Sequence, residues 1–191
     1  MTELRIARSE LILGGQKSGK TLRAEKLAAA WLAQSPRHRA VYIATAQAWD
    51  EEMRERIARH QRQRADRVPG MITVEEPVEL AHAIGQHSRA DTLIVVDCLT
   101  LWLTARLMPA VGRKEEGTGN GEGATIAGAL RACAGPIVLI SNEIGLGVIP
   151  MGKDVRTFVD ALGGLNQQAA AACERVTLMS AGLPLTLKGS S

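Results

Sequence analysis

The sequence predicts an α/β protein of three layers, in which a mainly parallel sheet is covered by helices on both faces. Short apolar runs alternate with helical patterns from one end of the chain to the other. These runs are continuously apolar, which is typical of parallel strands buried on both faces. The first run leads directly into a glycine-rich turn and a helix, as in phosphate-binding α/β folds. The length of 191 residues fits a single domain, residues 1–191.

Five apolar runs are expected to be buried strands, and a sixth is a weaker candidate. They are residues 10–13, 40–45, 92–97, 137–141 and 176–179, with residues 72–76 as the weaker one. Pro77 follows the weaker run, where a proline commonly opens a helix. Ligands of doubly wound folds bind beyond the carboxyl ends of the strands, so the site is expected at that edge of the sheet.

The helices are expected to differ in how deeply they pack. Apolar residues at helical spacing predict a packed helix over residues 22–32. Residues 50–64 carry a charge at nearly every position and predict a largely solvated helix that can hold chemistry on its exposed side. Residues 99–108 and 124–134 predict a further pair of helices. Residues 109–123 between them are rich in glycine and charge, which predicts a flexible surface loop within the domain.

The composition narrows the partners. The net charge of +3 suits a protein that binds polyphosphates but is too small for a nucleic-acid partner, and one Phe, one Tyr and three Trp supply few stacking surfaces for bases. Cys98, Cys133 and Cys173 lie in apolar sequence and are expected to be small core residues in a reducing compartment. No signal peptide or run of membrane length is evident, so a cytoplasmic protein without a stable membrane anchor is expected.

A phosphate-binding loop follows the first predicted strand. Its eight residues fit the pattern G-x-x-x-x-G-K-[ST]: Gly14, Gly15, Gln16, Lys17, Ser18, Gly19, Lys20 and Thr21. In such a loop the backbone N–H groups bind phosphate oxygens at the start of a helix. Lys20 would then reach the β- and γ-phosphates, and Thr21 would ligate Mg²⁺. The alternative is a glycine turn that caps a helix without binding a ligand.

Two further strand ends carry polar side chains at the same edge. Asp97 ends the run 92–97 and is the candidate for the second acidic position of a nucleotide site, where it would hold Mg²⁺ directly or through water. An aspartate at this place could also cap a helix. Asn142 and Glu143 follow the run 137–141 and could sense the γ-phosphate or position an attacking hydroxyl, or form a plain turn.

His60 lies on the predicted solvated helix among Arg59, Arg62 and Arg64. Neighbouring positive charge favours the neutral imidazole, which leaves a ring nitrogen able to attack phosphorus. The same arginines could hold the phosphates being transferred. The residues alone leave the alternative open that His60 is a surface histidine and the arginines a solvated face.

Taken together, these segments resemble the bifunctional adenosylcobinamide kinase/adenosylcobinamide-phosphate guanylyltransferase family of cobalamin biosynthesis. The resemblance runs from residue 11 to residue 188. The segments that carry it are residues 14–21, 42–47, 50–53 with 56–57 and 60, 74–77, 96–103, 141–147, 156–160, 166–167 and 181–184.

The resemblance implies a RecA-like P-loop fold and a covalent GMP-histidine intermediate on His60, with Lys20 also catalytic. It implies nucleotide binding by the phosphate loop and by Ala44, Thr45, Ala46, Arg64, Glu75 and Asp97. Mg²⁺ would be held by Thr21 and Asp97, with GTP and ATP as substrates. Members assemble as trimers with active sites near subunit contacts. The chain departs from the family pattern at Gly164, where a basic residue is usual, and at Glu174, where Asp is usual.

The function expected from this resemblance has two steps. ATP or GTP phosphorylates adenosylcobinamide, and GTP then transfers GMP to adenosylcobinamide phosphate through the histidine, which yields adenosylcobinamide-GDP. Two alternatives stay open from the residues: a P-loop small-molecule kinase without the guanylyl step, and a non-catalytic nucleotide-dependent switch. A GMP adduct separates the first from the bifunctional enzyme, and turnover of adenosylcobinamide separates the second.

Overall fold

The computed structural model describes residues 4–48, 51–107 and 121–189. Strands and helices alternate along most of the chain. In order they are β1 (Ser9–Gly14), α1 (Lys20–Gln34), β2 (Arg39–Ala44), α2 (Glu51–Arg67), β3 (Ile72–Glu75), α3 (Leu80–His87), β4 (Thr92–Asp97), α4 (Leu99–Leu107), α5 (Gly121–Ala132), β5 (Ile137–Ile140), α6 (Lys153–Ala172), β6 (Arg175–Ser180) and β7 (Leu183–Lys188).

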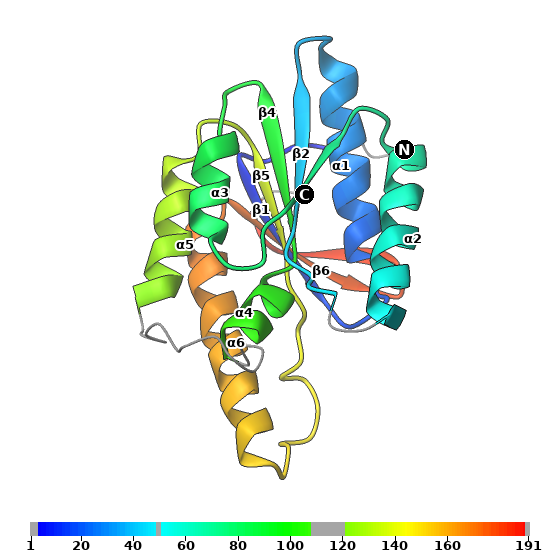
Figure 1. Ribbon diagram of the computed structural model, residues 1–191. Coiled ribbons are helices and arrows are strands. Elements are labelled where there is room, and N and C mark those ends of the chain that lie inside the picture. The colour runs from blue at the N-terminus through cyan, green and yellow to red at the C-terminus, as the bar shows by residue number, and fades with distance from the viewer. Residues whose placement is uncertain (1–3, 49–50, 108–120, 190–191) are drawn as a thin grey trace.

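The strands form one sheet of seven in the order β3-β2-β4-β5-β1-β6-β7. Every neighbouring pair is parallel except β6 and β7, which form an antiparallel hairpin at one edge. Figure 1 shows α1 and α2 on one face of the sheet and α3, α5 and α6 on the other. The predicted three-layer architecture with a mainly parallel sheet is therefore confirmed.

Each face of the sheet has its own apolar core, because successive side chains of a strand point to opposite faces. On β1, Leu11 and Leu13 pack with the side of α3, α5 and α6, while Ile12 packs with α1. The central strands β4 and β5 are buried along nearly their whole length. This double coverage explains why their sequences are continuously apolar.

The predicted buried strands are all present, but the hairpin strand β7 and the helix α6 were not predicted. The side chains of β7 are mostly exposed, because the strand lies at the edge of the sheet, so it lacks a continuously apolar run. The expectation that Pro77 opens a helix is wrong, since α3 begins at Leu80. The carboxylate of Glu76 instead accepts hydrogen bonds from the N–H groups of Val78 and Glu79, at 2.9 and 2.8 Å, and so stabilises a turn.

The predicted loop over residues 109–123 extends too far. Residues 109–120 lie outside the described residues, and residues 121–123 belong to the first turn of α5. Ile126 and Leu130 of this helix are buried in the core, and such packing outweighs the weak helix propensity of glycine. The helix predicted over residues 50–64 continues to Arg67, and residue 50 lies outside the described part.

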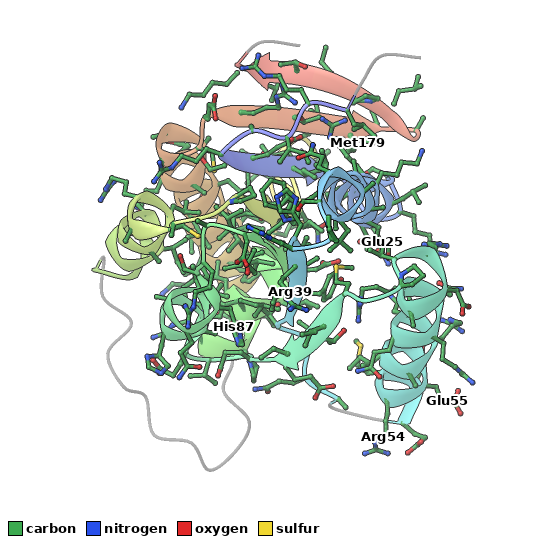
Figure 2. The ribbon with its side chains drawn as sticks, turned by 90° about the horizontal axis from the view of Figure 1, so that it is seen from above. Glu25, Arg39, Arg54, Glu55, His87 and Met179 are labelled. Carbon is green, nitrogen blue, oxygen red and sulfur yellow. The ribbon has the colours of Figure 1, made fainter. Side chains whose placement is uncertain are left out.

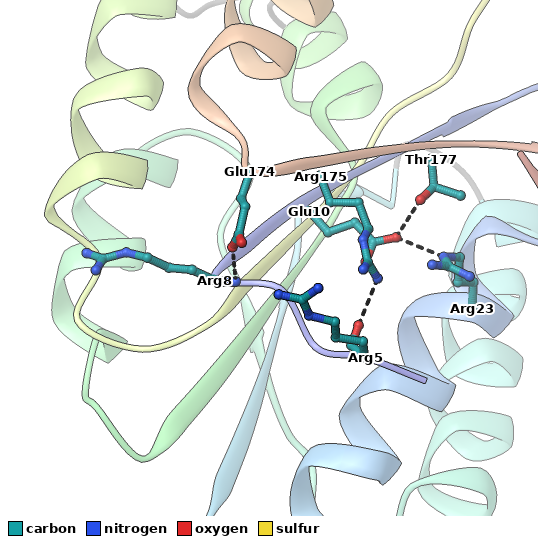
Figure 3. A network of polar contacts seen from close by, with 7 residues as sticks. All are labelled: Arg5, Arg8, Glu10, Arg23, Glu174, Arg175 and Thr177. Carbon is teal, nitrogen blue, oxygen red and sulfur yellow. Dashed lines mark hydrogen bonds and ion pairs between the residues drawn. The ribbon is translucent and has the colours of Figure 1, made fainter. Parts of the chain in front are cut away.

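A buried polar network fixes the elements on both sides of the phosphate loop (Figure 3). Glu10 of β1 is 1% exposed and accepts hydrogen bonds from Arg23 Nε of α1 at 2.9 Å and from Thr177 Oγ1 of β6 at 2.8 Å. Arg175 Nη1 lies 3.9 Å from the second oxygen of Glu10. Because a buried charge is costly without partners, this network ties α1 to β1 and β6 in one arrangement. Glu174 stands where Asp was expected from the resemblance. Its carboxylate accepts a hydrogen bond from the N–H of Arg8 at 2.8 Å, so an acidic side chain has a structural partner at this position.

The helix α2 is the least embedded of the long helices. Figure 2 shows Arg54 and Glu55 near its amino-terminal end, pointing away from the sheet. Arg54 pairs with Glu51 on the same exposed surface.

The three cysteines are buried and free of disulfides, which confirms their expected place in the core. Among the described residues, no helix combines the length and the apolar character needed to cross a bilayer.

Candidate active site

The phosphate loop is the tight turn between β1 and α1. Gly14 has φ 147°, and a Cβ there would collide with the Met179 carbonyl oxygen and lie 2.6 Å from Ser18 Oγ. Gly19 has φ 103°, and a Cβ there would lie 3.2 Å from the Cα of Gly182. The N–H of Gly182 donates a hydrogen bond to the Ser18 carbonyl at 3.0 Å. The loop therefore requires glycine at these two positions and is held against the β6–β7 turn.

Lys20 crosses this loop from the first turn of α1. Its Nζ donates hydrogen bonds to the carbonyl oxygens of Gly14 at 2.8 Å and Gly15 at 2.7 Å. Burial lowers the pKa of Lys20, while Cys98 and Asp97 oppose this effect. The ammonium group is thus placed at the mouth of the loop, where a phosphate oxygen would compete for its donors.

Asp97 lies at the carboxyl end of β4, across β5 from the loop strand. Its Oδ2 accepts hydrogen bonds from Thr21 Oγ1 at 2.9 Å and from Tyr42 Oη at 2.6 Å. The structure therefore brings together the two positions predicted to hold Mg²⁺. A hydroxyl and a carboxylate are hard oxygen ligands, which fit a magnesium ion that keeps water and phosphate oxygens as its other ligands.

The helix α2 presents His60 and Arg64 one turn apart on the same face. The His60 side chain is exposed, whereas Arg64 is only 4% exposed. The guanidinium carbon of Arg64 lies 3.5 Å from the centre of the Tyr42 ring. A histidine at the surface and a buried arginine are thus held side by side above the end of β2.

The remaining predicted residues lie at the ends of β2 and β3. Ala44 and Glu75 line a pocket, and Glu75 accepts a hydrogen bond from Gln61 Nε2 of α2 at 2.9 Å. Thr45 is fully buried, and its Oγ1 donates to the Cys98 carbonyl at 2.7 Å and accepts from the Cys98 N–H at 2.8 Å. Thr45 therefore joins β2 to β4 beneath the pocket wall. Ala46 lines the pocket itself.

Two pockets meet at the loop. The first has a volume of about 420 Å³ and both apolar and polar lining residues, among them Gln16, Ala44, Ala46, Met53, Ile57, Glu75, Asp97, Leu101, Ile140 and Asn142. The second, of about 370 Å³, lies between α1 and α2 and includes Ser18, Gly19, Gln63 and Arg67. Both pockets are lined by Lys17, Lys20, Thr21, His60 and Arg64. A larger pocket, of about 750 Å³, is lined by none of the predicted site residues.

Asn142 and Glu143, which follow β5, have different surroundings: the first lines a pocket and the second forms a turn. Asn142 lines the first pocket, and its N–H donates to Thr100 Oγ1 at 2.9 Å. The Glu143 carboxylate instead accepts the N–H of Gly145 at 2.9 Å, and its own N–H donates to the Gly14 carbonyl at 3.2 Å. Glu143 thus forms the turn that was the alternative at this position.

Tyr42 and Gln61 are site residues that sequence reasoning did not single out. Tyr42 lies within an apolar run, where an aromatic residue is normally read as core, and Gln61 is one of many polar residues on α2. The one available signal is that Tyr42 is the single tyrosine of the chain and lies two residues before the end of a strand that reaches the site.

The fold and this site define a P-loop nucleotide-binding protein. Residues 10–187 match the family described as cobinamide kinase / cobinamide phosphate guanyltransferase, and the chain belongs to that family. It is 46% identical over 181 residues to the bifunctional adenosylcobalamin biosynthesis protein CobP of Pseudomonas aeruginosa, covering 94% of this chain and 97% of the relative. It is 31% identical over 187 residues to the protein CobU of Escherichia coli, with coverage of 93% and 98%.

Membership of this family confirms the expected RecA-like P-loop fold and the transferase class. The chain has kinase and guanylyltransferase roles in cobalamin biosynthesis, and its match extends across nearly all of both relatives. The kinase without guanylyl transfer and the non-catalytic switch are therefore not supported.

Proposed function

We propose that one phosphate loop serves two reactions and that His60 takes part in only the second. In the first reaction a nucleoside triphosphate, ATP or GTP, phosphorylates the aminopropanol hydroxyl of adenosylcobinamide. In the second, GMP from GTP is transferred to adenosylcobinamide phosphate through His60. The observation that carries this proposal is that His60 lines both pockets together with Lys20 and Thr21 of the loop.

The first pocket suits the nucleoside and the second suits the polyphosphate. Met53, Ile57 and Leu101 give the first pocket apolar surface on which a base can lie. The second is lined by the cationic side chains of Lys17, Lys20, Arg64 and Arg67, of which Arg67 pairs at 3.0 Å with Glu25, a further lining residue. A nucleotide that lay across both pockets would place its α-phosphate near His60, which lines both of them.

In the phosphorylation step, the substrate hydroxyl oxygen forms a bond to the γ-phosphorus while the bond from that phosphorus to the bridging oxygen breaks, which releases the nucleoside diphosphate. The hydroxyl proton leaves to solvent or a base. The loop amides and Lys20 would stabilise the charge that develops on the nucleotide oxygens, because their donors are already oriented by the fold.

In the guanylyl transfer, a nitrogen of His60 bonds to the α-phosphorus, and the bond to the bridging oxygen breaks to release pyrophosphate. An oxygen of adenosylcobinamide phosphate then attacks the same phosphorus, and the nitrogen–phosphorus bond breaks, which frees His60. Arg64 would hold a phosphate oxygen in both half-steps, since a guanidinium matches the geometry of phosphate.

Mg²⁺ is part of this proposal, with Thr21 and Asp97 as its protein ligands. When bound, it would neutralise charge on the nucleotide oxygens. Support comes from the convergence of a hydroxyl and a carboxylate at 2.9 Å. The described residues contain no group of three or more His, Cys, Asp or Glu that could hold a metal alone, so the phosphates would complete the site.

The proposed partners are adenosylcobinamide and its phosphate, in a cytoplasmic homotrimer without a nucleic-acid partner. The trimer rests on the family resemblance, and assembly of several copies is supported by the apolar segment between β5 and α6. There Leu146, Val148, Ile149 and Met151 are 79 to 97% exposed, which is unusual for large apolar side chains unless another surface covers them.

Incubation with GTP labelled in the α-phosphate tests the proposal. We expect one labelled GMP on the chain, stable in alkali and released by acid, as for a phosphoramidate. His60→Asn should abolish the label, while Glu55→Gln, which places an amide at an exposed position of the same helix outside both pockets, should keep it. Undiminished labelling of His60→Asn would contradict the assignment.

A further inference from the structure

Tyr42 contacts two parts of the site, the residues beside the phosphate loop and the helix α2. It lies on β2, is 4% exposed and is the single tyrosine of the chain. Its hydroxyl donates a hydrogen bond of 2.6 Å to Asp97 Oδ2, and the face of its ring lies under Arg64 at 3.5 Å. One buried side chain therefore contacts the carboxylate beside the phosphate loop and the buried arginine of α2.

The way in which Arg64 is held is unusual for a buried cation. A buried arginine is normally paired with a carboxylate. Among the residues that the structure describes, no acidic side chain forms an ion pair with Arg64, and its Nε is buried without a hydrogen-bond partner. The ring of Tyr42 takes the place of a carboxylate, because the negative face of an aromatic ring attracts a guanidinium. Arg64 thereby keeps donors for a phosphate in the pockets that it lines.

The hydroxyl of Tyr42 has a separate role, which is to bind the carboxylate of Asp97. The Oδ2 atom of Asp97 accepts from both Tyr42 and Thr21, so one carboxylate oxygen is engaged by two hydroxyl groups. Two hydrogen bonds from different elements restrict the rotation of the carboxylate. The other oxygen, Oδ1, is then presented in a fixed direction.

We propose that Tyr42 is a positioning residue with two separable actions: its hydroxyl orients Asp97, and its ring holds Arg64 in place for a nucleotide phosphate. The assignment of a phosphate to Arg64 rests on the proposed function. The contacts with Asp97 and Arg64 are independent of it. A tyrosine that only filled the core would need neither the hydroxyl nor the ring face.

Two substitutions separate the actions. Tyr42→Phe removes the hydroxyl and keeps the ring, so we expect kcat of phosphorylation to fall about tenfold, with the Kd for GTP changed less than about twofold. Tyr42→Leu also removes the ring, and the Kd for GTP should then rise about tenfold further. Equal effects of the two variants on Kd would overturn the role of the ring. A kcat for Tyr42→Phe equal to that of the wild type would overturn the role of the hydroxyl.

A double-mutant cycle with Arg64→Ala checks the contact itself. In the Arg64→Ala background, Tyr42→Leu should weaken GTP binding no more than Tyr42→Phe does, because the ring no longer has a cation to hold. Full additivity of Tyr42→Leu and Arg64→Ala would contradict the coupling. Circular dichroism and thermal unfolding of each variant identify any that fail to fold, and Tyr42→Phe, the smaller change, still tests the hydroxyl if Tyr42→Leu does not fold.

A cycle of stability measurements offers a readout that needs no turnover, because the contact between Tyr42 and Asp97 belongs to the folded chain. Tyr42→Phe should decrease the free energy of unfolding in the wild-type background and should decrease it less in the Asp97→Ala background, where the hydroxyl has lost its acceptor. Equal decreases in the two backgrounds, measured by denaturant titration, would overturn the proposed hydrogen bond. If the wild-type chain forms no GMP adduct, the role of His60 fails, but this cycle still decides whether the Tyr42 hydroxyl holds Asp97.

Discussion

The phosphate loop and the helix α2 meet in one site but are built in opposite ways. The loop is fixed by backbone contacts: Gly14 and Gly19 have positive φ, Lys20 is bonded to two loop carbonyls, and the β6–β7 turn supports the loop from behind. The helix is charged along most of its length and exposes His60, and Arg64 is its buried contact with the Tyr42 ring.

The difference explains how one phosphate loop would serve both proposed reactions. Holding a polyphosphate requires many oriented donors, and a rigid loop supplies them without reorganisation. A nucleophile must instead approach phosphorus and accept a covalent group, which suits an exposed side chain on a peripheral helix. Changes in the loop should therefore damage both reactions, whereas changes on α2 should damage one more than the other.

The largest effect expected in the loop comes from Lys20→Ala. We predict a loss of about a thousandfold in phosphorylation, equivalent to about 4 kcal/mol of transition-state stabilisation, and a strong loss of guanylyl transfer. Lys26→Ala removes an exposed lysine from the same helix and serves as the control. Steady-state rates of both reactions measure the effect, and rates near those of the wild type would mean that the loop is only structural.

A smaller effect is expected where the loop contacts β6. Gly14→Ala places a methyl group against the Met179 carbonyl and 2.6 Å from Ser18 Oγ, at φ 147°. We predict a decrease in the free energy of unfolding of about 2 to 4 kcal/mol, measured by denaturant titration. Gly15→Ala is the matched control, since a Cβ there has no neighbour within 4 Å. Equal stability of the two variants would contradict the tight contact.

The effect expected to be smallest near neutral pH concerns the buried cysteines. Burial first, and then Asp97, raise the pKa of the Cys98 thiol from 9.0 to about 12, and burial raises that of Cys173 to about 12. In mildly alkaline buffer we expect almost no alkylation of the native chain and modification of all three cysteines in denaturant. Because the unfolded thiols lose their protons first, the free energy of unfolding should decrease as the pH rises between about 9 and 12. Rapid native labelling of Cys98 would contradict this burial.

The sequence predicts the loop well for a physical reason. Gly14 and Gly19 are required by the backbone, so their spacing is readable, while the phosphate and metal roles of Lys20 and Thr21 stay predictions. Asp97 is readable because it ends a buried strand. The hairpin strand β7 is not, because its exposed side chains lack the apolar run that marks buried strands.

The roles on α2 depend on contacts between distant segments. Nothing in residues 51–67 alone distinguishes Arg64 from the other arginines, and its burial arises only because Tyr42 lies opposite on β2. Similarly, Thr45 was expected to bind nucleotide, yet its position beneath the pocket wall follows from its bonds to the backbone of Cys98. Whether Thr45 influences the nucleotide stays a prediction.

The central claim is that one loop serves both reactions while His60 serves only the second. The most direct test is to supply His60→Asn with adenosylcobinamide, GTP and Mg²⁺ and to quantify both products by chromatography. We predict that adenosylcobinamide phosphate accumulates at a rate within about threefold of the wild type and that adenosylcobinamide-GDP does not form. Formation of adenosylcobinamide-GDP at the wild-type rate, or loss of both products in a folded variant, would contradict the account.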